Sequence, residues 1–168
     1  MFPIRRAPWV PIIAIGLLGL SVQAQGNDAM EAIKKAASKQ AQGKMAQTLN
    51  LPTAAPEGAK VYIIEPKAGA TVSSPVKIVF GLHGMGVAPA GVQNDNTGHH
   101  HLLIDDPQVN LSQPLPASEQ VVHFGGGQTQ TEVELSPGKH KIQLILADWK
   151  HQSFNPPLMS QKISITVE

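Results

Sequence analysis

Short runs of alternating apolar and polar residues, separated by turns, fill the chain from Gly58 to Glu168. The clearest run is KHKIQLILAD at 139–148, in which every second residue points to the same side of an extended strand. One side carries His140, Ile142, Leu144, Leu146 and Asp148, and the other begins with two lysines and a glutamine. This alternation is typical of a β-strand with one face in a core, and it does not fit a helix.

Seven such runs are predicted to be strands, with glycine, proline, serine or asparagine at nearly every junction. Many short strands with frequent turns favour an all-β fold, an immunoglobulin-like antiparallel β-sandwich of about seven strands. The chain has no cysteine, so the Cys-Trp-Cys pattern of true immunoglobulin domains is absent and the prediction concerns architecture only. The predicted strands are 60–66, 76–82, 99–105, 120–124, 130–135, 139–148 and 160–167.

The first 24 residues have the composition of a secretory signal peptide. Arg5 and Arg6 precede an apolar run from Val10 to Leu20, and small residues lead to a predicted cleavage site after Ala24. We therefore expect an exported protein, periplasmic or secreted. The apolar run is shorter than the roughly 20 residues that cross a bilayer as a helix, and no membrane span is expected in the mature chain.

Between the predicted signal peptide and the predicted β-sandwich domain (58–168) lies a segment of different composition. Residues 25–57 are rich in alanine, lysine and glutamine and end in LPTAAPEG, a sequence of linker character. This segment is predicted to be a tether, helical or disordered. The alternative is an oligomerising or docking helix with a thin apolar stripe.

Charge and cysteine content exclude several classes of partner and site. Without the predicted signal peptide the formal charge is about −1, because both arginines are removed, and no basic patch suggests nucleic acid binding. The lack of cysteine excludes disulfides, thiolate zinc sites, blue copper sites and thiol nucleophiles.

All seven histidines of the chain lie between positions 83 and 151, and three are consecutive in NTGHHHLLID at 96–105. Residues two apart in a strand are about 6.6–6.8 Å apart and point the same way. His99 and His101 are therefore predicted to share one face, while His100 faces the core with Leu102 and Ile104. A His-x-His pair is a recurrent holder of zinc or copper, since two imidazoles can converge on one ion.

Further ligands can come from neighbouring strand ends or loops. His123, His140 and His151 are candidates for the third ligand. Asp105 or Asp148 can bind the ion directly, or can orient an imidazole through a hydrogen bond to the ring nitrogen that does not bind the ion. The alternative is structural, because a histidine at a strand end is often satisfied by hydrogen bonds. This structural alternative applies above all to His83 and His140.

Catalysis has little support in the sequence. No GxSxG motif is present, and Asp105 and Asp106 are neighbours that cannot easily face one substrate. We therefore expect a non-catalytic protein that binds copper or zinc as a carrier, buffer or sensor. The alternative is a metal-free module that binds a protein or glycan through the aromatic, proline-rich loop 148–159, and a third hypothesis is a small metalloenzyme.

The strings GLHGMGVAPAG, NTGHHHLLID, HFGGGQT, PGKH, the D-x-x-H at 148–151 and NPP occur in this order. In this pattern the chain resembles an exported bacterial family, domain of unknown function 4399, over roughly residues 60–167. The resemblance implies one β-sandwich domain behind a signal peptide and no established activity. The resemblance implies that Asn96 and His100 are further orienting residues. This chain departs from the family pattern at Phe154, where related sequences often have histidine. The marked polar positions are Asn96, Thr97, His99, His100, His101, His123, His140, Asp148 and His151.

Overall fold

The computed structural model describes residues 19–49 and 51–168, which divide into two compact units on either side of the Met45–Ala46 bond. Most of the predicted signal peptide lies outside the described residues. A helix, α1 (Gly19–Thr48), begins in the last residues of the predicted signal peptide and continues through most of the segment predicted to be a tether, where Met30, Ile33 and Met45 are exposed. Among the described residues, no helix is both long and apolar enough to cross a bilayer.

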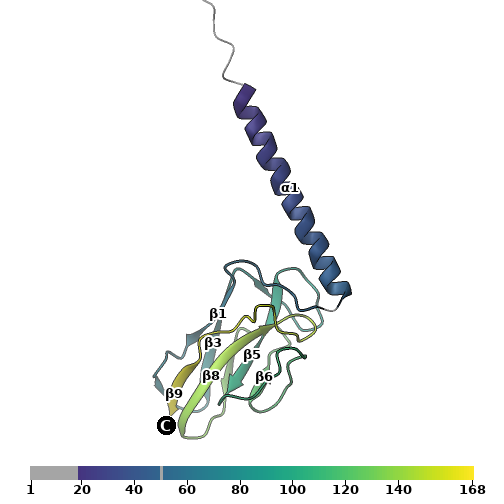
Figure 1. Ribbon diagram of the computed structural model, residues 1–168. Helices are drawn as coiled ribbons and strands as arrows, with labels where there is room; N and C mark the ends of the chain where they lie inside the picture. Colours follow the sequence, from purple (N-terminus) through teal and green to yellow (C-terminus); the bar gives the residue numbers. More distant parts are fainter. Residues whose placement is uncertain (1–18, 50) are drawn as a thin grey trace, which may run out of the picture. The chain divides into compact units, whose positions relative to one another are not determined.

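The second unit consists of strands and loops (Figure 1). Seven of its strands correspond to the predicted runs, and two strands of two residues each, β2 (Thr71–Val72) and β4 (Gly86–Val87), were not predicted. The described strands are β1 (Lys60–Glu65), β2 (Thr71–Val72), β3 (Val76–His83), β4 (Gly86–Val87), β5 (Thr97–Ile104), β6 (Val121–His123), β7 (Gln130–Val133), β8 (Gly138–Ala147) and β9 (Ile163–Val167).

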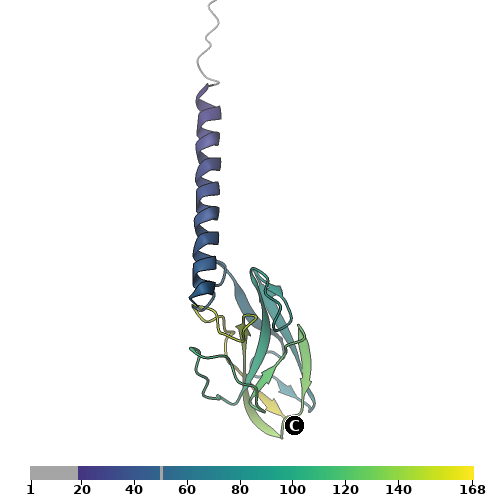
Figure 2. The same cartoon turned by 90° about the vertical axis from the view of Figure 1, so that its right-hand side faces the viewer.

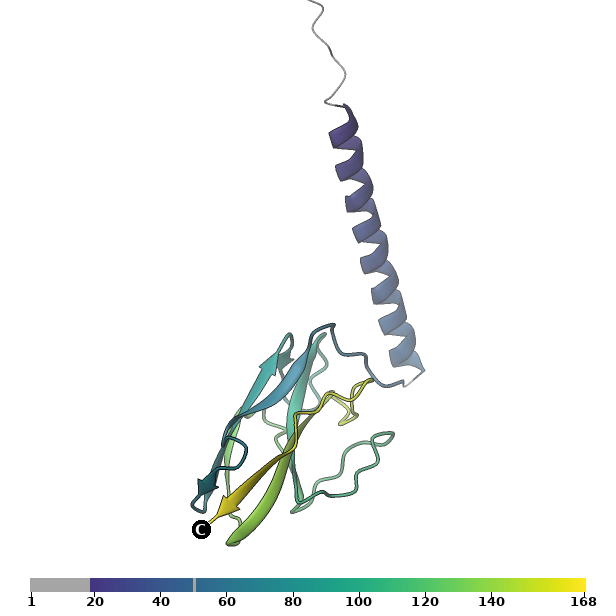
Figure 3. The ribbon, with the colours of Figure 1, turned by 60° about the vertical axis from the view of Figure 1, so that its left-hand side comes forward.

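Two sheets pack face to face as a β-sandwich (Figure 3). One sheet has the order β1-β3-β7, and the other has the order β2-β9-β8-β5-β4, with β6 also paired to β5. All the longer strands pair in antiparallel fashion, as predicted. The prediction of purely antiparallel sheets is wrong at two short ladders, because β2 runs parallel to β9 and β4 runs parallel to β5.

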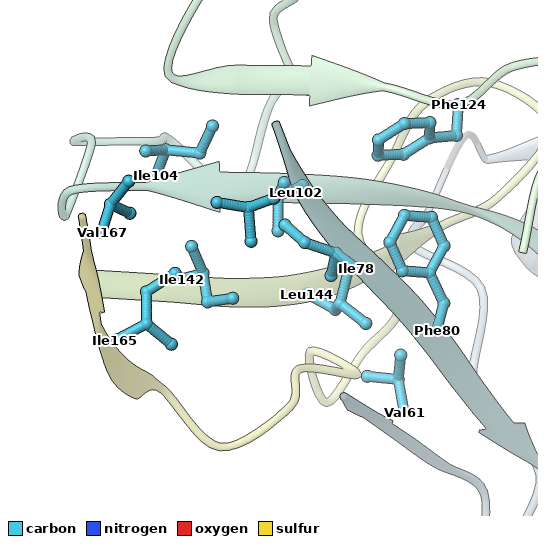
Figure 4. Close-up of a cluster of buried hydrophobic side chains, with 11 residues drawn as sticks. Val61, Ile78, Phe80, Leu102, Ile104, Phe124, Ile142, Leu144, Ile165 and Val167 are labelled. Carbon is cyan, nitrogen blue, oxygen red and sulfur yellow. The ribbon is translucent and has the colours of Figure 1, made fainter. Parts of the chain in front are cut away.

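The main core lies between the two sheets (Figure 4). Alternate residues of β3 are buried, and on β8 the same alternation places Ile142 and Leu144 against Ile78. At one end of this core the rings of Phe80 and Phe124 lie 4.8 Å apart. The period-two pattern that predicted the strands is therefore the pattern of core-facing side chains.

A second apolar cluster covers the opposite face of the β5–β8 pair. Ile145 and Ala147 of β8 are fully buried although they point away from the main core. The connections 105–120 and 148–162 supply residues that pack on them, and the first of these connections reaches outward from the sheet (Figure 2). Both faces of β5 and of the second half of β8 are thus largely shielded from water. The cluster comprises Leu103, Leu115, Val121, Ile145 and Ala147, with Val109, Leu111 and Met159 packed against it.

Leu144→Ala tests the main core. Leu144 is completely buried, so we expect the free energy of unfolding to fall by about 2–5 kcal/mol, from lost burial and the remaining cavity. Urea denaturation measures the change. The matched control is Leu51→Ala, because Leu51 is half exposed and its truncation should change stability by less than about 1 kcal/mol. Equal losses in both variants would contradict this assignment of the core.

Candidate metal centre

Strand β5 brings three consecutive histidines into the interior. Its register with β8 sets His99 opposite Ala147, His100 opposite Leu146 and His101 opposite Ile145. Because both faces of β5 are covered, all three imidazoles are at most 1% exposed. Strand alternation then separates them, as the sequence predicted: His100 belongs to one face, and His99 and His101 belong to the other.

His100 packs in the main core. Its ring centroid lies 5.1 Å from that of Phe80. It makes no hydrogen bond of ordinary geometry with the described residues, although the backbone of Gln128 lies near enough to raise its pKa. Burial is the larger influence and lowers the pKa of His100 to about 4. His100 is therefore a neutral core residue that lies across the sheet from His99 and His101.

His99 and His101 meet two further histidines on the loop-covered face. His123 ends β6 and is the cross-strand partner of His101, and His151 lies in the turn after β8. Ring centroids in this four-histidine cluster are 4.7 Å apart for His123 and His151, and 5.0 Å apart for His99 and His101. Four of the seven histidines thus converge on one volume.

Three of these rings bring nitrogen atoms into a common neighbourhood. One ring nitrogen each from His99, His123 and His151 lies within 4.8 Å of the other two. The Nε2 atoms of His123 and His151 are only 3.1 Å apart, a distance at which one nitrogen can donate its proton to the other. The same separation allows two neutral imidazoles to direct their lone pairs at one ion.

The cluster favours neutral imidazoles. Burial, and to a smaller extent the neighbouring histidines, lower the pKa of His99 to about 4 and that of His101 to about 3. Burial and His151 also lower the pKa of His123. Both ring nitrogens of His99 and His101 lack a hydrogen-bond partner among the described residues. A neutral imidazole with a free lone pair is the form that ligates a transition metal.

Asp148 positions the turn that carries His151. Its carboxylate is buried and accepts hydrogen bonds from the amides of Lys150 (2.8 Å) and Gln152 (3.0 Å). His151 has a left-handed backbone, with φ 65°, and its carbonyl accepts the amide of Leu115 at 2.7 Å. The Asp148 side chain therefore positions His151 by holding the backbone of the turn. The prediction that Asp148 contacts an imidazole nitrogen is wrong.

Two residues that help to position the histidines of the cluster, Thr53 and Gly125, were not predicted. Thr53, in the segment predicted to be a linker, donates its hydroxyl to Asp148 at 3.1 Å, and its carbonyl accepts the amide of Asn155 at 2.9 Å. The ring of His123 lies against Gly125, where an added Cβ would come within 2.3 Å of the ring. The glycine run at 125–127 is a local signal for close approach, whereas no local signal links Thr53 to Asp148.

Several predicted site residues lie elsewhere. His140 is near the start of β8, about 20 Å along the strand from the cluster. Its ring bonds Asp105 (2.8 Å) and the Ser136 carbonyl (2.9 Å), which is the structural alternative considered for it. Asp105 follows the end of β5 with φ 57° and serves His140, not the four-histidine cluster. Asn96 is exposed in a left-handed turn before β5.

Residues 78–168 match the family model described as Domain of unknown function (DUF4399). The match covers more than half of the chain and includes the whole four-histidine cluster. The chain belongs to this family. The resemblance seen in the sequence motifs is therefore confirmed, and family membership carries no assigned activity.

Two other similarities are limited in extent. The chain is 35% identical over 66 residues to the chloroplastic phosphoglucan phosphatase LSF1 of Arabidopsis thaliana, a match that covers 39% of this chain and 10% of that protein. The chain thus spans about a tenth of the length of this curated relative. The structure resembles that of an endo-beta-1,4-mannanase from Thermotoga petrophila with a TM-score of 0.42 and 14% identity, over 67% of this chain and 20% of that chain.

Asp148→Asn tests how the His151 turn is held. The amide keeps the shape but carries no charge, so its oxygen holds the amides of Lys150 and Gln152 less strongly than the carboxylate does. We expect a loss of about 1–3 kcal/mol in the free energy of unfolding and faster hydrogen exchange at the amides of Lys150 and Gln152. Asp95→Asn, at an exposed loop position, is the control and should change neither quantity. Unchanged exchange in Asp148→Asn would contradict this role.

His140→Gln tests the pair at the other end of β8. The Ser136 carbonyl and Asp105 raise the pKa of His140 above its ordinary value of 6.5. Stability from this group is therefore complete below the unfolded pKa and is lost as the pH rises through the folded pKa. We expect the wild type to exceed His140→Gln in urea midpoint most clearly below about pH 6, with a smaller difference at alkaline pH. Both proteins contain the same cluster histidines, so the titration of those residues does not contribute to the difference between the two urea midpoints. A difference that grows as the pH rises would contradict the assignment.

Proposed function

We propose that this protein is an exported, non-catalytic β-sandwich domain of immunoglobulin-like type that binds a copper or zinc ion as a carrier, buffer or sensor. The observation that carries the proposal is the convergence of one nitrogen each from His99, His123 and His151 within 4.8 Å. The signal-peptide features of residues 1–24 support export. Seven strands longer than two residues among those described, in two facing sheets, support the immunoglobulin-like type.

The spacing of the nitrogens fits a shared ion. Two imidazole nitrogens bound tetrahedrally at about 2.0–2.1 Å from one ion lie about 3.3 Å apart, and those of His123 and His151 are 3.1 Å apart. The nitrogen of His99 lies within 4.8 Å of both, so it must come at most about 1.5 Å closer to share the ion. Imidazole is a preferred ligand of both zinc and copper.

The burial of the imidazoles also fits an ion. Each ring nitrogen that is buried without a partner costs about 1–3 kcal/mol of folding free energy, and His99 carries two such atoms. A bound metal would satisfy one nitrogen of each ligand and offset part of this cost. Partial exposure of His123 and His151 gives an ion a route from solvent to the buried His99.

A non-catalytic role is supported by the surroundings of the cluster. General acid or base catalysis next to a metal needs a free carboxylate or similar group within hydrogen-bond reach of a bound water. Asp148, three residues before His151, bonds two backbone amides and the Thr53 hydroxyl. Asp105 is engaged with His140 at the other end of the strand.

Isothermal titration of the metal-free protein with Zn²⁺ and Cu²⁺ at neutral pH tests the proposal. We expect one ion per chain with submicromolar affinity, weakened on the order of a hundredfold by His123→Ala or His151→Ala. These two ligands are half buried at the edge of the cluster, so their truncation should leave the main core intact. The control is His83→Ala, an exposed histidine outside the cluster, which should bind as the wild type does.

Weak binding that is indifferent to these variants would overturn the metal proposal. The function then favoured is a metal-free module that binds a protein or glycan through the loop 148–159, in which Trp149 is half buried and Lys150 lies 5.4 Å from its ring. The partial relative named as a phosphoglucan phosphatase makes a glucan the first ligand to try in that case.

A further inference from the structure

We propose that His101 is the fourth ligand, and that the four-histidine cluster is a closed tetrahedral site that selects Zn²⁺ over Cu²⁺. This inference rests on the proposed function and adds the coordination number and the identity of the ion. The three-nitrogen group of His99, His123 and His151 leaves one tetrahedral position open. His101 borders all three of these rings.

The four rings lie near the corners of a regular tetrahedron. An ion about 2.0–2.1 Å from each nitrogen lies about 3.2 Å from each ring centroid, which sets the centroids of four tetrahedral imidazoles about 5.2 Å apart. The six observed separations scatter about this value. They are 5.0 Å (His99–His101), 5.1 Å (His99–His123), 4.9 Å (His99–His151), 4.9 Å (His101–His123), 6.0 Å (His101–His151) and 4.7 Å (His123–His151).

The longest separation identifies the movement that binding requires. His101 and His151 are 6.0 Å apart, so their rings must approach each other by about 1 Å to reach the tetrahedral spacing. His151 lies in a loop and is partly exposed, whereas His101 is fixed within β5. The loop ring is therefore the one that moves when the site closes.

An independent observation points to the same role for His101. Its side chain is 0% exposed, and neither Nδ1 nor Nε2 has a hydrogen-bond partner among the described residues. The next residue on its face is Leu103, and its β8 partner is Ile145, both apolar and buried. A leucine at position 101 would suit these neighbours better than an imidazole, unless the imidazole binds something. The centroid of the His101 ring lies 5.0, 4.9 and 6.0 Å from those of His99, His123 and His151, so a cation among these three rings would lie beside His101 as well.

A fourth imidazole decides which ion the site accepts. Zn²⁺ has no geometric preference from d electrons and is four-coordinate and tetrahedral in closed sites, whereas Cu²⁺ prefers tetragonal or square-planar ligands. Cu²⁺ outbinds Zn²⁺ in unconstrained sites of the same ligands. A β-strand that fixes two imidazoles and a paired strand that fixes the third oppose the flattening that Cu²⁺ requires. The closed site also leaves no position for water or substrate on the ion.

Co²⁺ replaces Zn²⁺ with similar geometry and reports coordination by its visible spectrum, so the purified protein loaded with Co²⁺ tests the proposal. We expect an intense tetrahedral spectrum that added azide does not change. In His101→Leu we expect zinc affinity to fall on the order of a hundredfold, and the Co²⁺ spectrum to shift with azide, because a solvent molecule occupies the opened position. The Cu²⁺-to-Zn²⁺ affinity ratio should rise in this variant.

His100→Leu is the matched control. It is the same substitution at an equally buried neighbour on the opposite face of β5, and it should leave metal affinity and the azide response as in the wild type. If His101→Leu retains wild-type zinc affinity, or if azide already shifts the wild-type Co²⁺ spectrum, the fourth-ligand inference is overturned while three-histidine binding stands. If the wild type binds Cu²⁺ but neither Zn²⁺ nor Co²⁺, the closed zinc site is overturned while the proposed function stands, and if it binds none of the three ions, the proposed function itself fails.

Discussion

The pairing of β5 with β8 is the constraint on which the remainder of the sandwich domain depends. Six consecutive residue pairs join these two strands, from His99 and Ala147 to Ile104 and Ile142. Their one face forms the main core with the three-stranded sheet, and their other face is covered by loops. Because neither face meets water, every side chain that β5 carries must be accommodated in the interior, including three imidazoles.

Burying three adjacent histidines is unfavourable unless each imidazole makes favourable contacts in the interior. His100 packs on Phe80 as a neutral aromatic ring, next to the backbone of Gln128. His99 and His101 pack instead against the rings of His123 and His151. Four neutral imidazoles in contact are poor hydrogen-bond partners for one another, since each offers one donor and one acceptor with fixed directions. A single cation satisfies one lone pair on each ring at once, which makes a metal ion the simplest occupant that this cluster accommodates.

The sequence predicts the parts of the site that follow from strand periodicity. The alternation in HHHLLID is enough to separate His100 from His99 and His101, and the structure agrees because β5 is a regular strand with no bulge. Residue type alone does not distinguish His140 from His151, the two candidates at opposite ends of β8. That distinction needs the register of β5 on β8, which sets His99 beside Ala147 and leaves His140 with Asp105. The contact between Thr53 and Asp148 joins residues 95 positions apart and has no periodic signal.

Metal binding and folding are coupled in such a site, because the ligands come from three separate segments of the chain. β5, the end of β6 and the turn after β8 are brought together only in the folded domain, so the unfolded chain binds an ion much more weakly. At a free ion concentration a hundred times the dissociation constant, binding adds about 2.7 kcal/mol to the free energy of unfolding. The four buried, unpaired nitrogens of His99 and His101 each weaken the metal-free fold by about 1–3 kcal/mol. In the proposed site, the histidines that destabilise the metal-free domain would stabilise the metal-bound domain. Loss of the ion would be felt first at the His151 turn, which is held by the Asp148 carboxylate with its Thr53 partner and by the amide of Leu115.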